Sequence, residues 1–171
     1  LVDLAAGTYY VFVDGTVPGE AGNFALEVSI SAHDDAGESC GRPMASVISG
    51  SVSLTGSTAA YGDDATGRCR ATSDREVVYM MYLPGPAYVE IDTCTVLPTY
   101  DTFVYVRGVC TSDATGDEYG CNDQAVPACS EGPDMTRIVR PRLEAGLYYI
   151  FVDGAAGRYG DYSLQVDITP L

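Results

Sequence analysis

Two short acidic segments contain the residue types that bind calcium in proteins. One is GDEYGCND at positions 116–123, and the other is TYDT at positions 99–102. Ca²⁺ prefers several oxygen ligands from carboxylates, side-chain amides and backbone carbonyls. Asp and Asn in loops also brace turns by accepting backbone N–H groups, and both interpretations stay open because EF-hand spacing is absent. The candidate ligands for Ca²⁺, the one cofactor considered, are Asp101, Asp117, Asn122 and Asp123.

The sequence shows no arrangement of residues that is typical of catalysis. It contains neither Gly-x-Ser-x-Gly nor His-Glu-x-x-His, which mark two large classes of hydrolase. Its one histidine, His33, lies in a stretch of Ser, Asp, Ala and Gly that is typical of a surface linker. Nothing in the sequence places a nucleophilic Ser and an oxyanion hole beside it. We therefore predict that the protein has no catalytic residues and is not an enzyme.

Six cysteines form an even set without a Cys-x-x-Cys motif: Cys40, Cys69, Cys94, Cys110, Cys121 and Cys129. Since one histidine is too few for common zinc sites, disulfides are the better interpretation, and they predict a secreted, extracellular or cell-surface protein. We expect a Cys110–Cys121 bond, because it would close a short loop between two predicted strands. The remaining pairs are then expected to be Cys40–Cys69 and Cys94–Cys129.

The formal net charge of −15 comes from 24 acidic residues and nine arginines, with no lysine in the chain. Such a charge disfavours nucleic acid and anionic lipid as partners. No apolar run approaches the length of about 18 residues that a membrane-spanning helix needs. We therefore expect neither nucleic-acid binding nor a membrane span.

The elements that position these residues are predicted to be strands. Apolar residues alternate with polar ones through Phe24–Ile30 and again through Tyr162–Ile168, which is typical of a strand with one face on a core. Leu147–Val152 is apolar on both faces and is predicted to be a central strand. Other predicted strands are 46–54, 75–83, 87–93, 101–107 and 136–143. With about eight or nine strands and no helix, we predict an all-β antiparallel β-sandwich with jelly-roll-like topology.

One two-strand unit occurs twice. LAAGTYYVFVDG at 4–15 and LEAGLYYIFVDG at 143–154 share nine of twelve letters, and the match continues with a one-residue deletion to Ile30 and Ile168. We therefore divide the chain into an extra N-terminal hairpin, residues 1–30, and a complete β-sandwich domain, residues 31–171. Since a lone hairpin is marginal in water, the first unit is predicted to complete a neighbouring domain or subunit. Its apolar assembly residues are Tyr9, Val11, Val13, Phe24, Leu26 and Val28.

A family resemblance rests on YDTFVYVRGVC…YGCNDQ (100–124), followed by LEAGLYYIFVDG and GDYSLQVDI. These segments resemble the bacterial pre-peptidase C-terminal-like β-sandwich domains, in the version common in secreted myxobacterial proteins. The matching positions are Asp101, Thr102, Arg107, Cys110, Cys121, Asn122, Asp123, Gly146, Tyr148, Asp153, Gly154, Gly160, Tyr162, Leu164 and Val166. The chain departs at Gln124, where an Asp is usual, and this weakens a metal site that needs both acids. The resemblance implies a secreted, non-catalytic module associated with substrate attachment or adhesion.

Two functions follow as hypotheses. The first is a secreted structural or adhesive repeat that assembles head-to-tail, as a tandem array or by strand complementation into an extracellular filament. Its partners would be copies of itself or adjacent repeats. The alternative is a non-catalytic substrate-binding accessory domain of a secreted hydrolase, whose partner would be an extracellular polymer.

Overall fold

The computed structural model describes residues 11–14, 22–28, 36–70, 74–95, 98–125, 129–130, 132 and 134–171. Contacts between Cα atoms divide the chain into two compact units, Leu1–Asp34 and Asp35–Leu171. Within the described residues, no helix has the length and apolar character needed to cross a membrane.

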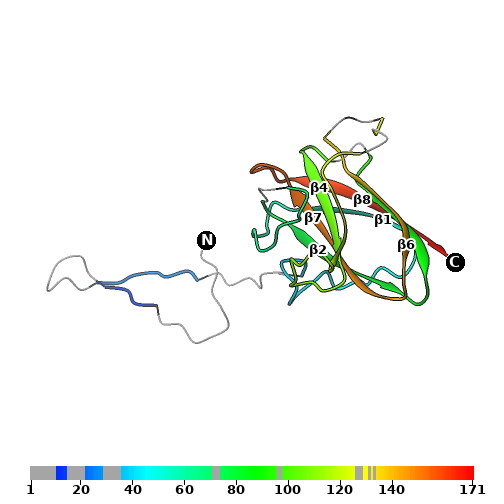
Figure 1. Ribbon diagram of the computed structural model, residues 1–171. Coiled ribbons are helices and arrows are strands. Elements are labelled where there is room, and N and C mark those ends of the chain that lie inside the picture. The colour runs from blue at the N-terminus through cyan, green and yellow to red at the C-terminus, as the bar shows by residue number, and fades with distance from the viewer. Residues whose placement is uncertain are drawn as a thin grey trace. The chain divides into compact units, whose positions relative to one another are not determined.

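The described part of the second unit contains eight strands (Figure 1). In chain order they are β1 (Val52–Ser57), β2 (Val77–Leu83), β3 (Ala87–Asp92), β4 (Thr102–Arg107), β5 (Glu118–Asn122), β6 (Arg137–Leu143), β7 (Gly146–Gly154) and β8 (Asp161–Pro170).

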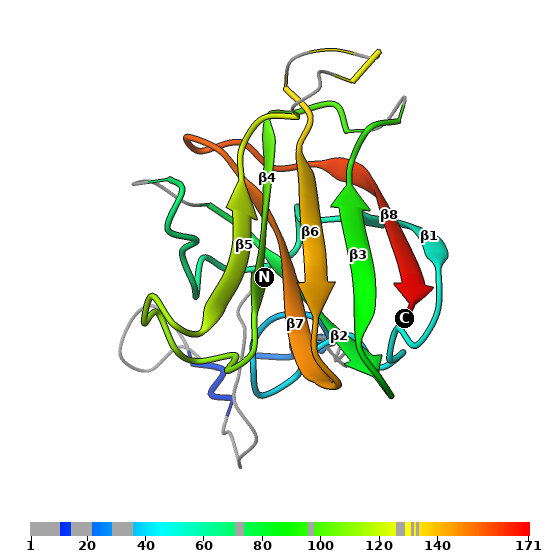
Figure 2. The same cartoon turned by 45° about the vertical axis from the view of Figure 1, so that its right-hand side comes forward.

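The strands form two antiparallel sheets with the orders β1-β8-β3-β6 and β2-β7-β4-β5, and Figure 2 shows the first of these sheets in front. Pairing joins β4 to β5, β3 to β6, β2 to β7 and β1 to β8. The eight strands therefore form one long antiparallel ribbon that is folded over so that successive pairs alternate between the sheets. This is the arrangement of a jelly roll, so the predicted fold class is confirmed.

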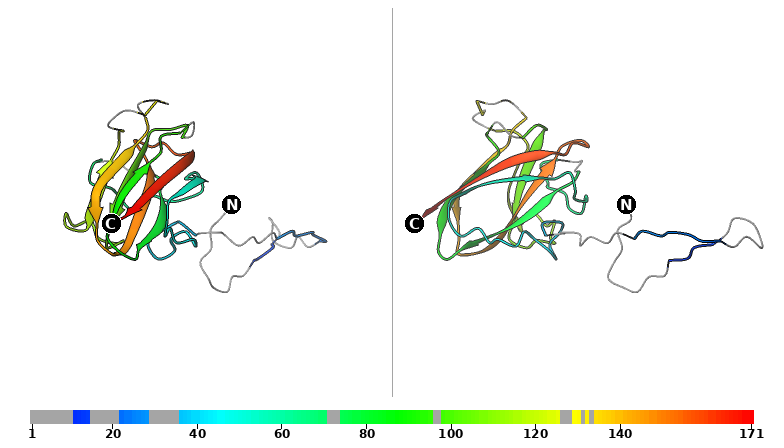
Figure 3. Two further views of the ribbon diagram at one scale, coloured as in Figure 1. Left: turned by 90° about the vertical axis from the view of Figure 1, so that its right-hand side faces the viewer. Right: turned by 180° about the vertical axis from the view of Figure 1, so that it is seen from behind.

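β7 and β8 are inner strands, one in each sheet. β7 lies between β2 and β4, and β8 lies between β1 and β3 and extends to the C-terminal end of the chain (Figure 3). The run from Ile150 to Ala155 is fully buried, as predicted for a central strand covered on both faces. β8 alternates, with buried Tyr162, Leu164 and Val166 facing the core between the sheets.

The second sheet is also covered on its outer face. Val78, Phe103, Tyr105 and Phe151 form an apolar cluster there, separate from the core between the sheets. Loops cover this face. They are held to the sheet by Arg107, whose guanidinium donates to the backbone oxygens of Thr66 and Cys110. Gly67 lies so close to the Tyr105 ring that a Cβ atom would come within 2.5 Å of it.

Three disulfides fasten these segments, and two of the expected pairings are wrong. The bonds are Cys40–Cys110, Cys69–Cys121 and Cys94–Cys129, so only the last expected pair is confirmed. Cys121 lies opposite Tyr105 in the β4–β5 ladder, whereas Cys110 lies five residues further along the chain. At about 3.3 Å per residue this separation exceeds the Cα spacing of about 6 Å that a disulfide allows. Each of the two cysteines instead bonds a covering segment.

Peptide mapping under non-reducing conditions is expected to recover peptides linked through Cys40–Cys110 and through Cys69–Cys121. The two linked pairs separate on reduction, and the same digest after reduction and alkylation provides the control. A peptide linked through Cys110–Cys121 would contradict the β4–β5 register, because these residues lie at different heights on the ladder.

The strand expected at 46–54 is displaced in the structure. β1 begins at Val52, and Ile48 instead forms a parallel bridge with Met81 of β2. The predicted run therefore crosses from the edge of one sheet to the other, and its two halves have different neighbours. β5 was not among the predicted strands.

The first unit is described at residues 11–14 and 22–28, and neither segment forms a hydrogen-bonded strand. The paired strands expected there are not observed in these two segments. The physical reason is that two strands alone bury too little apolar surface to be stable in water. Tyr9, which belongs to the predicted assembly residues, lies outside the described residues.

Candidate functional site

The predicted calcium ligands fall into two groups. Asp101 immediately precedes β4 and Asp123 immediately follows β5, which brings them to the same end of the sheet. Between them lies Arg70, whose guanidinium is 2.8 Å from the Asp101 carboxylate and 3.2 Å from that of Asp123. Burial raises the pKa of Asp101, and the positive charge of Arg70 opposes this rise. A cation of the chain itself therefore contacts both carboxylates.

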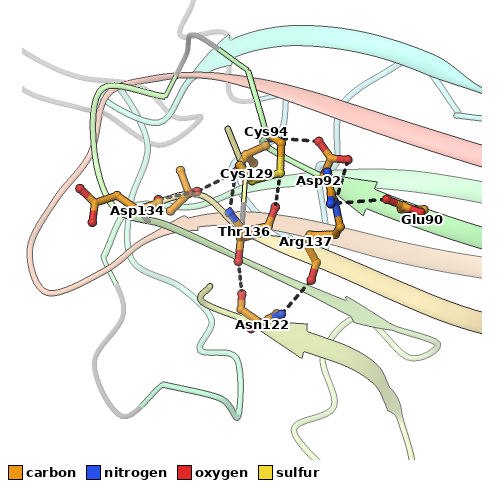
Figure 4. Close-up of a disulfide and its surroundings, with 10 residues drawn as sticks. Glu90, Asp92, Cys94, Asn122, Cys129, Asp134, Thr136 and Arg137 are labelled. Carbon is orange, nitrogen blue, oxygen red and sulfur yellow. Dashed lines mark hydrogen bonds and ion pairs between the residues drawn. A yellow bond between two sulfur atoms is a disulfide. The ribbon is translucent and has the colours of Figure 1, made fainter. Parts of the chain in front are cut away.

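Asn122 has a structural role in this region (Figure 4). Its side-chain amide donates to the Arg137 backbone oxygen at 2.8 Å, and its side-chain oxygen accepts from the Gln124 amide at 3.1 Å. Its backbone oxygen accepts a hydrogen bond from the Thr136 hydroxyl at 2.6 Å. These bonds fix the end of β5 against the start of β6, so the bracing interpretation describes what Asn122 does.

Asp117 lies at the opposite end of β5 from Asn122 and Asp123, with its carboxylate bonded to the Ser112 hydroxyl. The structure therefore does not bring the four predicted ligands together. No group of three or more His, Cys, Asp or Glu side chains suited to a metal ion occurs in the described part of the chain. His33 lies outside the described residues, so the structure does not address its environment.

A cavity of about 600 Å³ on the outer face of the second sheet was not predicted. Val78, Phe151 and Arg107 of the sheet line it, and the Arg107 guanidinium lies over the Phe151 ring. The rest of its lining comes from the covering loops and from Glu76: Ser39, Cys40, Gly41, Asp64, Ala65, Thr66, Glu76, Cys110, Thr111 and Asp113. The cavity thus lies between the sheet and the segments that the disulfides fasten.

Two buried carboxyl groups meet at one end of this face. Val77 pairs with Val152, so the next position along the antiparallel ladder places Glu76 opposite Asp153. Both side chains are 0% exposed. Burial is the main cause that raises the pKa of Glu76 to about 8 and that of Asp153 to about 9, and repulsion by Glu76 contributes to the rise for Asp153.

Each of these carboxyl groups is held through one oxygen only. Glu76 Oε1 accepts from the Asp64 amide at 2.9 Å, and Asp153 Oδ1 accepts from the amides of Asp74 and Gly154. Glu76 Oε2 and Asp153 Oδ2 are buried and have no hydrogen-bond partner among the described residues. The second oxygens are therefore shielded from solvent and receive no hydrogen bond from the described residues.

Sequence reasoning assigned Asp153 to a turn and gave Glu76 no role. Asp153 does accept from the amide of Gly154 within its Asp-Gly pair, but its complete burial opposite another acid was not predicted. The sequence did contain a signal for the burial of Glu76. Glu76 directly precedes the strand VVYMMYL and lies on the same strand face as the buried Val78. An acid that continues a buried face is costly unless it is held or neutralised.

The fold and this cavity define a disulfide-linked jelly-roll β-sandwich with a covered outer sheet face. No family model matches the chain, and no curated protein matches it. Among solved structures, the chain is similar to the pre-peptidase C-terminal domain of a collagenase from Bacillus anthracis. The two are 14% identical with a TM-score of 0.45, and the match covers 71% of this chain and 92% of that chain. The name of that domain is the name of the family that the sequence segments resemble.

Proposed function

We propose that the protein is an extracellular structural module in which residues 1–30 complete a neighbouring jelly-roll domain. The neighbour is either an adjacent repeat of the same polypeptide or another copy of the chain, so that repetition gives a head-to-tail assembly. The three disulfides support an oxidising location outside the cell. The proposed role is non-catalytic.

The observation that carries this proposal is a contrast between the two copies of one unit. Residues 4–30 repeat the sequence of β7 and β8, the central strands of the two sheets. Ile150, Val152 and Leu164 are each 0% exposed in the sandwich. Their counterparts Val11, Val13 and Leu26 are 64%, 48% and 53% exposed.

This contrast indicates how the first unit would be stabilised. Burying apolar side chains of this size contributes about 1.5–3 kcal/mol each, and residues 1–30 have no core of their own in the described segments. A preceding repeat without its own β7 and β8 would have two interrupted sheets, because each of these strands joins two others. The two incomplete parts are complementary in both hydrogen bonding and apolar surface. Another copy of this chain would accept residues 1–30 at these two positions only in place of its own β7 and β8.

We test the proposal by sedimentation of the full chain over a range of concentrations. The unchanged chain is expected to form species heavier than one copy as concentration rises, and Leu26→Asp is expected to return it to one copy. Val139→Asp is the matched control, because Val139 is an exposed apolar residue of β6 in the second unit. Association that survives Leu26→Asp would contradict assembly through the hairpin.

A chain that stays as one copy at every concentration would contradict completion by another copy. The tandem version is tested separately on a polypeptide with a second repeat in front of residue 1. There, the amides of residues 11–13 and 24–28 are expected to become protected from hydrogen exchange. Rapid exchange in the longer polypeptide would contradict the tandem version as well.

The cavity on the outer face favours a second candidate function, that of a binding accessory domain. Clefts of about 300–1,000 Å³ are typical of ligand sites, and this cavity lies within that range. Retention of the chain on insoluble extracellular polymers would support this function, whereas passage through all of them would leave only the structural role.

A further inference from the structure

Three of the four strands at the edges of the sheets have features that hinder further pairing. The edge strands are β1 and β6 of one sheet and β2 and β5 of the other. The segment before β1 covers β2, because the amides of Met44 and Ile48 donate to β2 backbone oxygens at 2.8 Å. The end of β5 is fastened to the start of β6 through Asn122 (Figure 4), and β6 contains Pro141, which has no amide hydrogen. Covers and prolines of this kind keep sheet edges from pairing with other chains.

β1 has none of these features. Its backbone pairs with β8 alone among the described residues, and Figure 2 shows it at the outer side of its sheet. Its sequence VSLTGS contains neither a charged residue nor a proline. It lies within residues 43–62, a run without any charge in a chain that has 24 acidic residues and nine arginines. The free edge of β1 is therefore able to pair with a further strand.

An apolar groove of about 360 Å³ lies beside this edge. Val52 and Leu54 line it from β1, and Val47 lines it from the segment before β1. Val47 is 46% exposed, and Val52 and Leu54 are half-buried. No charged side chain is among the residues that line the groove. An added strand would therefore find accessible, uncharged apolar side chains on the core side of the sheet.

We propose that β1 receives residues 22–28 of another copy of this chain as an added strand. Phe24, Leu26 and Val28 of that copy would cover the groove, and its backbone would pair with the free edge of β1. This proposal rests on the assembly role of residues 1–30 proposed above, and it names the surface that accepts them in another copy. Pairing at β1 leaves the β7 and β8 of the accepting copy in place.

The internal repeat indicates why residues 22–28 fit β1. They repeat the part of β8 that already pairs with the other edge of β1. In that ladder Leu164 lies opposite Leu54, and Leu26 is the counterpart of Leu164 in the first copy of the unit. β1 would then lie between two strands of similar sequence.

Exposure and charge also match. Phe24, Leu26 and Val28 are 68%, 53% and 56% exposed, and they occupy alternate positions, so that they share one face of an extended strand. Glu27, the only charged residue in this segment, belongs to the opposite face and would not enter the groove. Since two copies with a net charge of −15 repel each other, a charge-free segment is a favourable place for them to meet.

The test is sedimentation of the full chain and of variants over a range of concentrations. Val47→Asp places a charge in the groove wall and is expected to weaken association by roughly tenfold or more, because strand addition would bury that charge. Val139→Asp makes the same change at a residue of β6 that is 59% exposed and is expected to leave association unchanged. Leu26→Asp is expected to abolish association from the side of the added strand.

Hydrogen exchange of the unchanged chain gives a readout that needs no variant. As concentration rises, amides of β1 and of residues 22–28 are expected to exchange more slowly together. Amides of β1 that exchange at the same rate in single and associated copies would overturn the proposal.

The outcomes separate this proposal from the assembly on which it rests. Association that Leu26→Asp abolishes but Val47→Asp does not change would overturn β1 as the acceptor and leave assembly through the hairpin standing. Association that Val47→Asp abolishes but Leu26→Asp does not change would mean that β1 receives a different segment, which overturns residues 22–28 as the added strand. A chain that stays as one copy at every concentration would overturn both this proposal and completion by another copy.

Discussion

Lowering the pH from 8 to 5 is expected to increase the free energy of unfolding by several kcal/mol. The cause is the buried pair at the end of β2 and β7. Burial raises the pKa of Glu76 from 4.5 to about 8 and that of Asp153 from 3.8 to about 9. Between these limits the folded state binds protons that the unfolded state has released.

The direction follows from linkage between proton binding and folding. Stability rises with pH only where the unfolded state binds more protons, and here the folded state binds more. The free energy of unfolding therefore falls as pH rises through this window, by up to about 1.4 kcal/mol per pH unit for each group. Relief of general repulsion among 24 acidic residues acts in the same direction.

Variants separate the two causes. Urea unfolding at a series of pH values, with the disulfides kept intact, measures the slope. Glu76→Gln and Asp153→Asn each remove one titrating group while keeping the oxygen that accepts backbone N–H groups, and each is expected to flatten the slope. Asp167→Asn serves as the control for net charge. A slope that is the same in all four proteins would show that the buried pair does not titrate as described.

Leu164→Ala is expected to cost about 2–5 kcal/mol of the free energy of unfolding, because it leaves a void in the core between the sheets. Leu164 is 0% exposed and lies opposite Leu54 in the β1–β8 ladder. The repeated sequence provides the control: Leu26 occupies the same position in the first copy and is 53% exposed.

Leu26→Ala is accordingly expected to leave the free energy of unfolding of the second unit unchanged at concentrations where the chain is one copy. Urea unfolding of both variants gives the comparison. Equal losses would mean that Leu26 also contributes to the core of the second unit, which contradicts the division into two units. At concentrations where the chain associates, Leu26→Ala is expected to lower the fraction of species heavier than one copy. Leu164→Ala is expected to lower that fraction only by unfolding the second unit.

Alternation and burial patterns in the sequence predicted most of the fold. β8 follows strict alternation from Tyr162 to Ile168, and β7 is apolar on both faces, which predicted its central position. β5 was missed because EYGCN has no such pattern and all five of its residues are only partly buried. The strand expected at 46–54 was misplaced because alternation does not reveal a crossing from one sheet to the other.

The site was less predictable because contacts distant in sequence decide it. Asp101 and Asp123 were expected to meet, but Arg70 enters from a loop that no local pattern connects to them. Glu76 and Asp153 become neighbours only through the β2–β7 register. The cysteine pairing failed for the same reason, since closeness along the chain favoured Cys110–Cys121 while the ladder separates them.

The central placement of β7 and β8 also determines when the second unit can fold. These strands are made after the other six strands of the unit, yet each joins strands made much earlier. Until residues near 170 emerge, β1 and β2 each lack the neighbour that joins them to the rest of their sheets, and the core side chains of both sheets stay uncovered. Non-local pairing of this kind slows folding. The sandwich therefore cannot close until all eight strands have been made, and exposed strand edges before that point favour association with other chains.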